Sequence, residues 1–540
     1  MPPPTRESAK IPVAPFPGFG YKAPMKRSPL FLTILVSALM VSGLQAGLKL
    51  PSLVGSHMVL QRDLANPIWG WADPGSDVTV TIAGQSHAAK VDDAGKWKVT
   101  LNPMAGSSHA LRMTIASKGE SIILSNIVIG EVWICSGQSN MQWSVSQSDD
   151  AELEMASANY PNIRFISVPQ VGTQEKQDDF KGQWDICTPE TVGEFSGVGY
   201  FFGRQLHQVL GVPIGLIDNA WGGSAAEAWI SREVIDADTR LQNVAEQWKT
   251  TEATFDYGKA MADWKVKADE AKAAGKPAPR APSNPMTGNQ RPGNIWAGVL
   301  HPTIGYGIRG TIWYQGESNA GRAYQYDEVF ALMISEWRKA WGIGDFPFYW
   351  VQLADFMAEK PEPGESSWAE LREAQTKTLS LPNTGQAVIY DLGEGRDIHP
   401  RDKQNVGKRL ARIALARDYG KTIEYQSPSY KAMEVKDGKA ILTFDNVGVA
   451  GLYGFDTQEV TGFAVAGEDK VWHWGVGKIV GPDKVEVSSA EVSAPVAVRY
   501  AWADNPVANF YSRNGLPVVP FRTDDWPLST DPANAPKPAQ

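Results

Sequence analysis

The sequence has few cysteines and none of the common metal-binding spacings. Only Cys135 and Cys187 occur in 540 residues, which excludes a fold held together by many disulfides. The two thiols either form a single bridge or stay free and buried. We favour free thiols because Cys135 ends an apolar run that precedes Ser139. CxxC, HExxH and Cys/His clusters are missing, so the sequence predicts no metal site.

Blocks of basic residues are also missing. The chain has 51 Lys and Arg against 60 Asp and Glu, a net charge of −9. A nucleic-acid partner is therefore not expected, because no basic patch is available to neutralise phosphates. The composition is otherwise that of a soluble globular protein, and the length is too great for one core, so we expect two to four domains.

Long apolar runs are scarce, and the one that stands out lies near the N-terminus. Lys26 and Arg27 precede an apolar run from Leu30 to Val41, and small residues follow at 42–46. This order is typical of a secretory signal, and the run is short for a membrane span.

We therefore predict an N-terminal extension and signal peptide over residues 1–46. The mature chain would start near Gly47, be exported to the periplasm or the cell exterior, and have no membrane contact after cleavage. Translation starts at either Met1 or Met25, because residues 1–24 are Pro-rich and fit no signal layout. An uncleaved membrane anchor is the alternative.

Short alternating runs mark two β-domains. Residues 47–130 contain runs such as 77–82 and 96–101, which are separated by Gly/Asp turns and predict a small β-sandwich. Residues 419–528 return to the same texture and predict a C-terminal β-domain. Residues 529–540 are rich in Pro and Ala and are predicted to be a disordered tail.

Residues 131–418 have a different texture, in which apolar runs alternate with segments of helical length. This pattern predicts an α/β domain with a parallel sheet covered on both faces. A polar segment at 232–292 predicts a helical insertion, either beside the site or on a surface without function. The clearest apolar runs are 212–217, 310–314, 348–353 and 387–390.

Ser139 is the candidate nucleophile. An apolar run from Ile127 to Ile134 stops at a Ser-Gly-Gln-Ser-Asn turn, and a helix-compatible segment follows. The serine would lie at the carboxyl end of a strand and near the N-terminus of a helix, where a developing oxyanion is favoured. The alternative is an ordinary turn with an N-capping serine.

His399 is the candidate base among seven histidines. It alone follows an apolar run that resembles a late parallel strand, and a predicted helix begins at Lys403. A base there would share a sheet edge with Ser139. Asp397, two residues earlier, could hold the imidazole in the required tautomer.

Two further loops offer donors for an oxyanion. Gly222 and Gly223 follow the run ending at Ile217, and paired glycines let backbone N–H groups approach a ligand closely. Gln315 follows the run ending at Tyr314 and carries a side-chain amide that can donate.

Together these segments resemble the sialate O-acetylesterase family of the SGNH hydrolase superfamily. The resemblance implies a flavodoxin-like SGNH hydrolase domain flanked by β-sandwich-like domains, and a serine esterase that removes acetyl groups from sugar hydroxyls. It also implies Ser139 as nucleophile, His399 as base, and an oxyanion hole formed by the Ser139 N–H, a glycine N–H and Gln315. The matching motifs are 130–141, 219–224, 313–319 and 397–400, with further similarity at 58–62 and 515–517.

The chain departs from the superfamily pattern in two places. Many members space the acid and base as Asp-x-x-His, but Arg396 stands at that position here. The acid is therefore Asp397, Asp391 or a backbone carbonyl. Superfamily members often carry an asparagine in the motif that corresponds to residues 313–319. In this chain Gln315 or Asn319 must serve in its place. The turn at Ser139 also lacks the second glycine of G-x-S-x-G, which argues against an α/β-hydrolase.

We expect an acetyl-enzyme mechanism that needs no metal or organic cofactor, acting on an acetylated carbohydrate. The sugar is sialic acid, acetylated xylan or another polysaccharide. A different reading is a secreted carbohydrate-binding protein with a vestigial esterase site, which twenty tryptophans would suit. The sequence predicts nothing about oligomeric state.

Overall fold

The computed structural model describes residues 47–534. The predicted signal peptide and the last six residues of the predicted tail lie outside this range. Across the described range, no helix has the length and apolar character that crossing a membrane requires.

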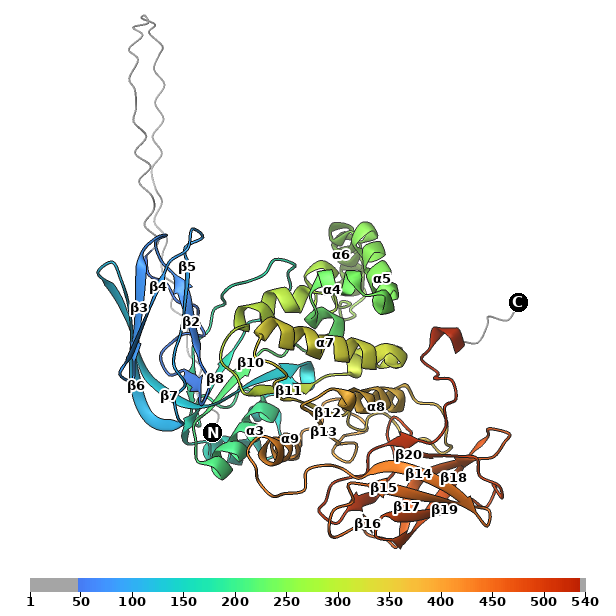
Figure 1. The fold of residues 1–540 in the computed structure, drawn as a ribbon. Helices are drawn as coiled ribbons and strands as arrows, with labels where there is room; N and C mark the ends of the chain where they lie inside the picture. Colours follow the sequence, from blue (N-terminus) through green and yellow to red (C-terminus); the bar gives the residue numbers. More distant parts are fainter. Residues whose placement is uncertain (1–46, 535–540) are drawn as a thin grey trace, which may run out of the picture. The chain divides into compact units, whose positions relative to one another are not determined.

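A central sheet carries the candidate site (Figure 1). Six of its strands are parallel, and a short antiparallel strand pairs with one edge, so the sheet is mixed. In spatial order the strands are β13 (Thr384–Ala387), β12 (Phe348–Val351), β11 (Gly310–Tyr314), β7 (Glu120–Gly137), β10 (Ile214–Asp218), β8 (Tyr160–Ser167) and the antiparallel β9 (Asp185–Cys187).

Five of the parallel strands follow the order expected for a flavodoxin-like sheet. Counted along the chain as β7, β10, β11, β12 and β13, they lie in the spatial order 2-1-3-4-5. β8 and β9 extend the sheet beyond β10, which the expectation did not include. Four of the five β10 residues are buried, which suits an interior strand. β8 begins with partly exposed Tyr160 and exposed Pro161, which suits a position near the edge.

Helices cover both faces of this sheet (Figure 1). α3 (Gly197–Leu210) and α9 (Lys403–Arg417) pack together, and their buried side chains join one core cluster. α7 (Tyr326–Trp341) and α8 (Ser367–Lys377) contribute to a second cluster on the other face. Ser196 caps α3 by accepting from Gly199 N at 3.0 Å, and Asp402 caps α9 through Asn405 N at 2.9 Å.

β7 belongs to two sheets. Its first half pairs antiparallel with β6 (Ser107–Ser117) and is partly exposed, and it then pairs with β1 (Val59–Gln61). From Glu131 onward it is fully buried between β10 and β11, as expected for a parallel sheet with both faces covered. The predicted domain boundary between residues 130 and 131 therefore falls inside one continuous strand.

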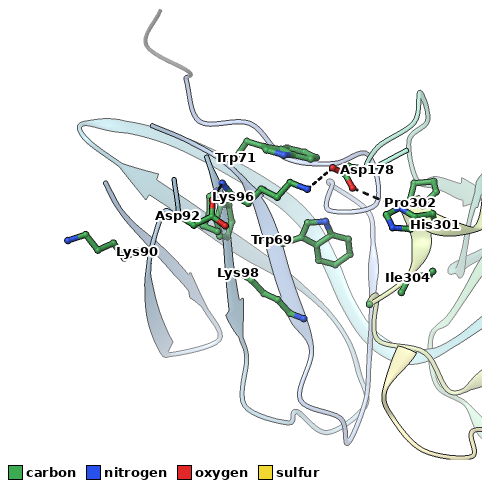
Figure 2. A pocket seen from close by; sticks show the side chains of 13 residues that line it. Trp69, Trp71, Lys90, Asp92, Lys96, Lys98, Asp178, His301, Pro302 and Ile304 are labelled. Atoms are coloured by element: carbon green, nitrogen blue, oxygen red, sulfur yellow. Dashed lines mark hydrogen bonds and ion pairs between the residues drawn. The ribbon is translucent and has the colours of Figure 1, made fainter. Parts of the chain in front are cut away.

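The remaining N-terminal strands form the β structure that precedes the central sheet. β3 (Asp77–Ile82) pairs with β4 (Gln85–Lys90) and with β6. β2 (Pro67–Trp71) pairs antiparallel with β5 (Lys96–Thr100) as a separate two-stranded sheet (Figure 2). In β2 the side chains alternate, with Ile68 buried and both tryptophans half-buried on the opposite face.

The C-terminal strands form a separate antiparallel sheet with its own core. A two-stranded sheet of β16 (Leu452–Gly454) and β21 (Phe510–Ser512) accompanies it. In spatial order the seven strands are β14 (Ser429–Lys436), β15 (Lys439–Asp445), β19 (Lys484–Ser488), β18 (Trp472–Gly481), β17 (Glu459–Ala466), β20 (Ala497–Tyr500) and β22 (Phe521–Arg522).

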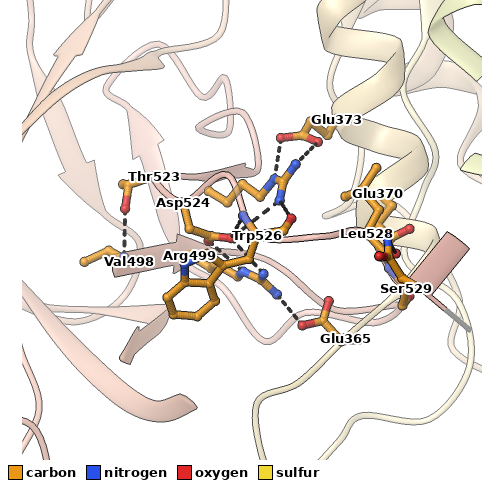
Figure 3. A network of polar contacts seen from close by, with 12 residues as sticks. Glu365, Glu370, Glu373, Val498, Arg499, Thr523, Asp524, Trp526, Leu528 and Ser529 are labelled. Carbon is orange, nitrogen blue, oxygen red and sulfur yellow. Dashed lines mark hydrogen bonds and ion pairs between the residues drawn. The ribbon is translucent and has the colours of Figure 1, made fainter. Parts of the chain in front are cut away.

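Ion pairs of two buried arginines connect this sheet to the segment that leads into α8 and to α8 itself (Figure 3). Arg499 pairs with Asp524 at 2.9 Å, and both side chains are almost fully buried. Arg499 also contacts Glu365 at 3.0 Å, and Arg522 pairs with Glu373 of α8 at 2.8 Å. Because charges taken out of water must be paired, these contacts specify how the C-terminal sheet attaches to the helix.

The predicted disordered tail is corrected at its beginning. Ser529 N donates to Glu370 Oε1 at 2.7 Å, and Thr530 N donates to Glu370 Oε2 at 3.1 Å. Both hydroxyls bind the same carboxylate at 2.6 Å. Glu370 is 1% exposed, so its charge needs these donors and holds the chain in place.

The apolar run at 387–390 is also reinterpreted. The strand β13 ends at Ala387, and Val388 and Tyr390 instead join the core of the C-terminal sheet. Their apolar character thus reflects packing between two sheets rather than strand formation. Cys135 and Cys187 are free and buried, as favoured from the sequence.

The polar insertion is helical over most of its length. α4 (Arg232–Ala237), α5 (Gln242–Thr254) and α6 (Tyr257–Ala273) occupy it, and the Pro-rich stretch follows. Near its end, Asn289 Nδ2 donates to Gly222 O at 2.5 Å, and Gln290 donates to Gly223 O. The last part of the insertion therefore contacts the glycine loop of the candidate site.

Candidate active site

Ser139 and His399 meet at the carboxyl end of the central sheet. Ser139 is the first residue of α1 (Ser139–Gln142), two residues after the end of β7, and its Oγ lies 2.9 Å from His399 Nε2. The turn requires Gly137, because φ is +137° and a Cβ there would lie 2.1 Å from Tyr314 O. As the first helical residue, Ser139 also presents one of the N–H groups that have no acceptor within the helix.

The His399 ring is held on two sides. Trp143 stacks on it with centroids 4.7 Å apart and an interplanar angle of 13°. Asp397 Oδ1 lies 3.4 Å from His399 Nδ1 and accepts from His399 N at 2.9 Å. Burial lowers the pKa of His399 from its ordinary value, while the Asp397 charge raises it in part. The ring is thus biased toward the neutral form that a general base needs.

The structure distinguishes the two carboxylates that could orient the His399 ring. Asp391 is bound by the Arg409 guanidinium through contacts of 2.6 and 2.7 Å, so its oxygens are already engaged. Asp397, by contrast, lies beside His399 Nδ1, with its side chain 49% exposed. Of the two carboxylates that the sequence left open, Asp397 is therefore the one in contact with the imidazole.

Gly222 lies against the candidate nucleophile. A Cβ at Gly222 would be 3.3 Å from Ser139 Cβ, so the loop approaches as closely as a glycine allows. The Gly222 N–H donates to Gln142 Oε1 at 2.8 Å. Gly223 has φ +71°, which favours glycine at that position. The glycine loop is therefore beside Ser139, with one of its N–H groups engaged by an α1 side chain.

Gln315 is not placed as an oxyanion donor. It is fully buried, and its Nε2 donates to Ser224 O at 3.1 Å and to Asn319 Oδ1 at 2.7 Å, while Oε1 accepts from Tyr326 OH at 2.8 Å. Asn319 is likewise occupied, because its Nδ2 donates to Glu227. Sequence reasoning assigned Gln315 from its position after a strand, but the buried polar network around it satisfies its amide internally.

A polar network next to Ser139 was missed from the sequence. Asn140 Nδ2 donates to Glu317 Oε1 at 2.6 Å and to Ile398 O at 2.9 Å. Asn140 Oδ1 accepts from Lys403 Nζ at 2.7 Å. Burial lowers the pKa of Lys403 to about 7 and raises the pKa of Glu317. The available signal was position, since Asn140 follows Ser139 and Lys403 begins the helix after His399.

A polar cleft of about 610 Å³ opens at Ser139 and His399. Trp143 and Gln142 line it, together with several serines and Asp218 at the end of β10. Burial raises the pKa of Asp218 to about 7. Over residues 47–534, no group of three or more His, Cys, Asp or Glu side chains is arranged to hold a metal ion. The arrangement presents a hydroxyl, an imidazole and backbone donors, which are the parts that acyl transfer requires.

Comparisons with known proteins agree with this geometry. The family model "Carbohydrate esterase, sialic acid-specific acetylesterase" matches residues 129–267 and 300–416. The mouse sialate O-acetylesterase is 30% identical over 91% of this chain and 97% of its own length. The human sialate O-acetylesterase is 31% identical over 73% of this chain and 76% of its own.

A solved structure is similar over nearly the whole described range. A carbohydrate acetylesterase from Xanthomonas citri is 38% identical, with a TM-score of 0.76, and the match covers 89% of this chain and all of that one. Because the identity to the mouse enzyme extends over almost all of that protein, the relationship includes the β-domains as well as the central sheet. The chain therefore belongs to the sialate O-acetylesterase family.

Proposed function

We propose that this protein hydrolyses O-acetyl esters of sialic acid or related acetylated glycans, with Ser139 as nucleophile and His399 as general base. The observation that carries the proposal is the 2.9 Å contact between Ser139 Oγ and His399 Nε2 at the floor of a polar cleft. A vestigial site in a binding protein would not need this pair to stay aligned. Membership in a family of acetylesterases supports the acetyl group as the acyl part.

The first half of the reaction transfers the acetyl group to the enzyme. Neutral His399 Nε2 takes the Ser139 proton as Oγ forms a bond to the acetyl carbon, giving a tetrahedral oxyanion. The carbon–oxygen bond to the sugar then breaks, and the imidazolium returns the proton to the leaving sugar oxygen. Asp397 stabilises the imidazolium through Nδ1, and the stacked Trp143 holds the ring in position.

The second half releases acetate. Water loses a proton to His399 as it attacks the acetyl carbon. The bond between that carbon and Ser139 Oγ then breaks, acetate leaves, and the imidazolium returns the proton to Oγ. The oxyanion in both halves is stabilised by the Ser139 N–H at the start of α1 and by the N–H groups of the glycine loop. For Gly222 to donate to the oxyanion, the Gln142 side chain turns away from it.

The test is acetate release by residues 47–540, with Ser139→Ala as the paired variant. The substrates are 9-O-acetylated sialic acid, acetylated xylan and a small aryl acetate. Serine-dependent release is expected, and Ser144→Ala provides a control serine in the same cleft. Release that persists in Ser139→Ala would contradict the nucleophile assignment. Binding of the glycans without any release would favour the carbohydrate-binding alternative.

We also propose an SGNH-type catalytic domain and export through the N-terminal signal. The SGNH proposal is supported by a serine in the turn between β7 and α1 and by a histidine in the loop before α9. The export proposal is supported by the order of basic, apolar and small residues over 26–46. N-terminal sequencing of the protein from its native host tests export. A mature start near Gly47 is expected, and a retained residue 26 would contradict cleavage.

A further inference from the structure

A second cavity lies away from the Ser139 cleft, on the N-terminal β structure (Figure 2). Its volume is about 440 Å³, within the range of roughly 300–1,000 Å³ typical of small-molecule sites. One wall comes from β2 and β5, and the other from Asp178 and residues 301–305. Among the described residues, the linings of the two cavities share no member.

The wall formed by β2 and β5 carries two tryptophans and two lysines on one face, which we call the platform (Trp69, Trp71, Lys96 and Lys98). Trp69 is paired with Lys98 and Trp71 with Lys96, so these four side chains share one face of the two-stranded sheet. Both tryptophans are half-buried, and the alternate residue Ile68 faces the core. Figure 2 shows Lys96 reaching between the two indole rings. Lys49 Nζ lies 5.0 Å from the Trp71 ring centroid, so one face of this indole already carries a cation. The indole surface that lines the cavity is suited to stacking on the C–H face of a sugar ring.

The charges on the platform are only partly paired. Lys96 Nζ contacts Asp178 Oδ2 at 2.7 Å, and both side chains are about half exposed, so this pair contributes little and opens easily. Lys98 forms no ion pair within residues 47–534. Lys90 and Asp92 at the rim have opposite charges. In a chain of net charge −9, the cavity thus offers a free ammonium beside an aromatic face, which is complementary to an anion.

We propose that this cavity binds a pyranose residue that carries a carboxylate, as a glycan subsite separate from the catalytic cleft. The ring stacks on the face that Trp69 and Trp71 share, and the carboxylate pairs with Lys98, the cross-strand neighbour of Trp69. The proposal rests on the proposed function only for the class of ligand. Sialic acid and uronic acids are both pyranoses that carry a carboxylate. The test therefore includes one probe of each class.

The test measures binding to the full chain by calorimetry. The probes are sialyllactose, lactose, which lacks the carboxylate, and a glucuronic-acid-substituted xylan oligosaccharide. The variants are Lys98→Gln and Trp71→Ala, and Lys478→Gln, at an exposed lysine of β18, is the matched lysine control. We expect an acidic probe to bind about tenfold more weakly to Lys98→Gln, as loss of a charge-assisted contact implies. Trp71→Ala is expected to weaken binding severalfold, and Lys478→Gln to leave it unchanged.

Three outcomes would overturn the proposal. One is that neither acidic probe binds, and another is that lactose binds as tightly as sialyllactose. The third is binding that is equal in wild type, Lys98→Gln and Trp71→Ala, which would locate the glycan elsewhere. The acidic probe that binds more tightly identifies the source of the carboxylate. Aryl acetate hydrolysis, measured on the same samples, reports on the esterase separately, so failure of one proposal is distinguishable from failure of the other.

Discussion

Lys403 Nζ donates a 2.7 Å hydrogen bond to Asn140 Oδ1, which joins the first residue of α9 to the residue after Ser139. The same asparagine donates to the carbonyl of Ile398, immediately before His399. One amide therefore connects the turn that carries Ser139, the loop that carries His399 and the following helix. Lys403 is fully buried, so hydrogen bonds to protein groups must replace the water that would otherwise solvate its side-chain nitrogen.

Lys403→Met is expected to change how stability depends on pH. In the folded chain the pKa of Lys403 is about 7, well below the ordinary value of 10.5, because burial disfavours its charge. Between these values the unfolded state binds more protons, so the wild-type free energy of unfolding rises with pH, by at most about 1.4 kcal/mol per pH unit. Urea unfolding at pH 7 to 10 measures this slope.

The matched control for that experiment is Lys408→Met, on the exposed side of the same helix. It should keep the wild-type pH dependence, whereas Lys403→Met should lose the rise between pH 7 and 10. Wild type and Lys403→Met curves that run parallel across this interval would show that Lys403 titrates normally in the folded protein.

Asp397→Asn is expected to lower kcat and to move the acid limb of kcat/KM to lower pH. The Asp397 charge raises the pKa of His399, so its removal leaves the depressing effect of burial unopposed. Because the carboxylate is half exposed and 3.4 Å from the ring, the loss should be smaller than the ~10⁴-fold typical of buried triad aspartates. A pH–rate profile on an aryl acetate gives both quantities; an unchanged acid limb would remove Asp397 from this role.

Gln315→Ala is expected to destabilise the fold rather than to disable catalysis selectively. The substitution removes the buried donor to Ser224 O and leaves Tyr326 OH only its 3.4 Å contact with the backbone carbonyl of residue 315, at a cost of about 1–3 kcal/mol. Loss of a true oxyanion donor would instead lower kcat by about 10²–10³-fold. Urea unfolding together with kcat of the folded fraction separates these effects. A large fall in kcat at unchanged stability would restore Gln315 to the oxyanion hole.

Asp524→Ala is expected to destabilise the C-terminal sheet. The side chains of Arg499 and Asp524 are 2% and 1% exposed. Removal of Asp524 leaves the buried Arg499 charge without this partner, which should lower the free energy of unfolding by about 3–5 kcal/mol. Glu365→Ala removes the more exposed partner of Arg499 and should cost less than about 1 kcal/mol. Chemical denaturation compares the two, and equal losses would mean that Asp524 is not the main counter-charge.

Much of the site was readable from local pattern. An apolar run that stops at a Gly-Ser turn places Ser139 at the end of a strand, because side-chain burial and turn chemistry are both local properties. His399 was found in the same way, from an apolar run on one side and a helix start on the other. The glycine pair Gly222-Gly223 follows the same logic, and its approach to Ser139 required only that parallel strands end at one edge.

The sequence by itself thus predicted the α/β and β segments, the family, and the pairing of Ser139 with His399 that the structure shows as a contact. Only the tertiary structure decided that β8 and β9 extend the sheet beyond β10, that Gln315 is consumed in a buried network and that Asp391 is bound by Arg409. Only it showed that Lys403 reaches Asn140 across 263 positions of sequence. The physical reason is that strand order and the partner of a polar group depend on long-range packing, whereas strands, turns and caps are fixed by neighbouring residues.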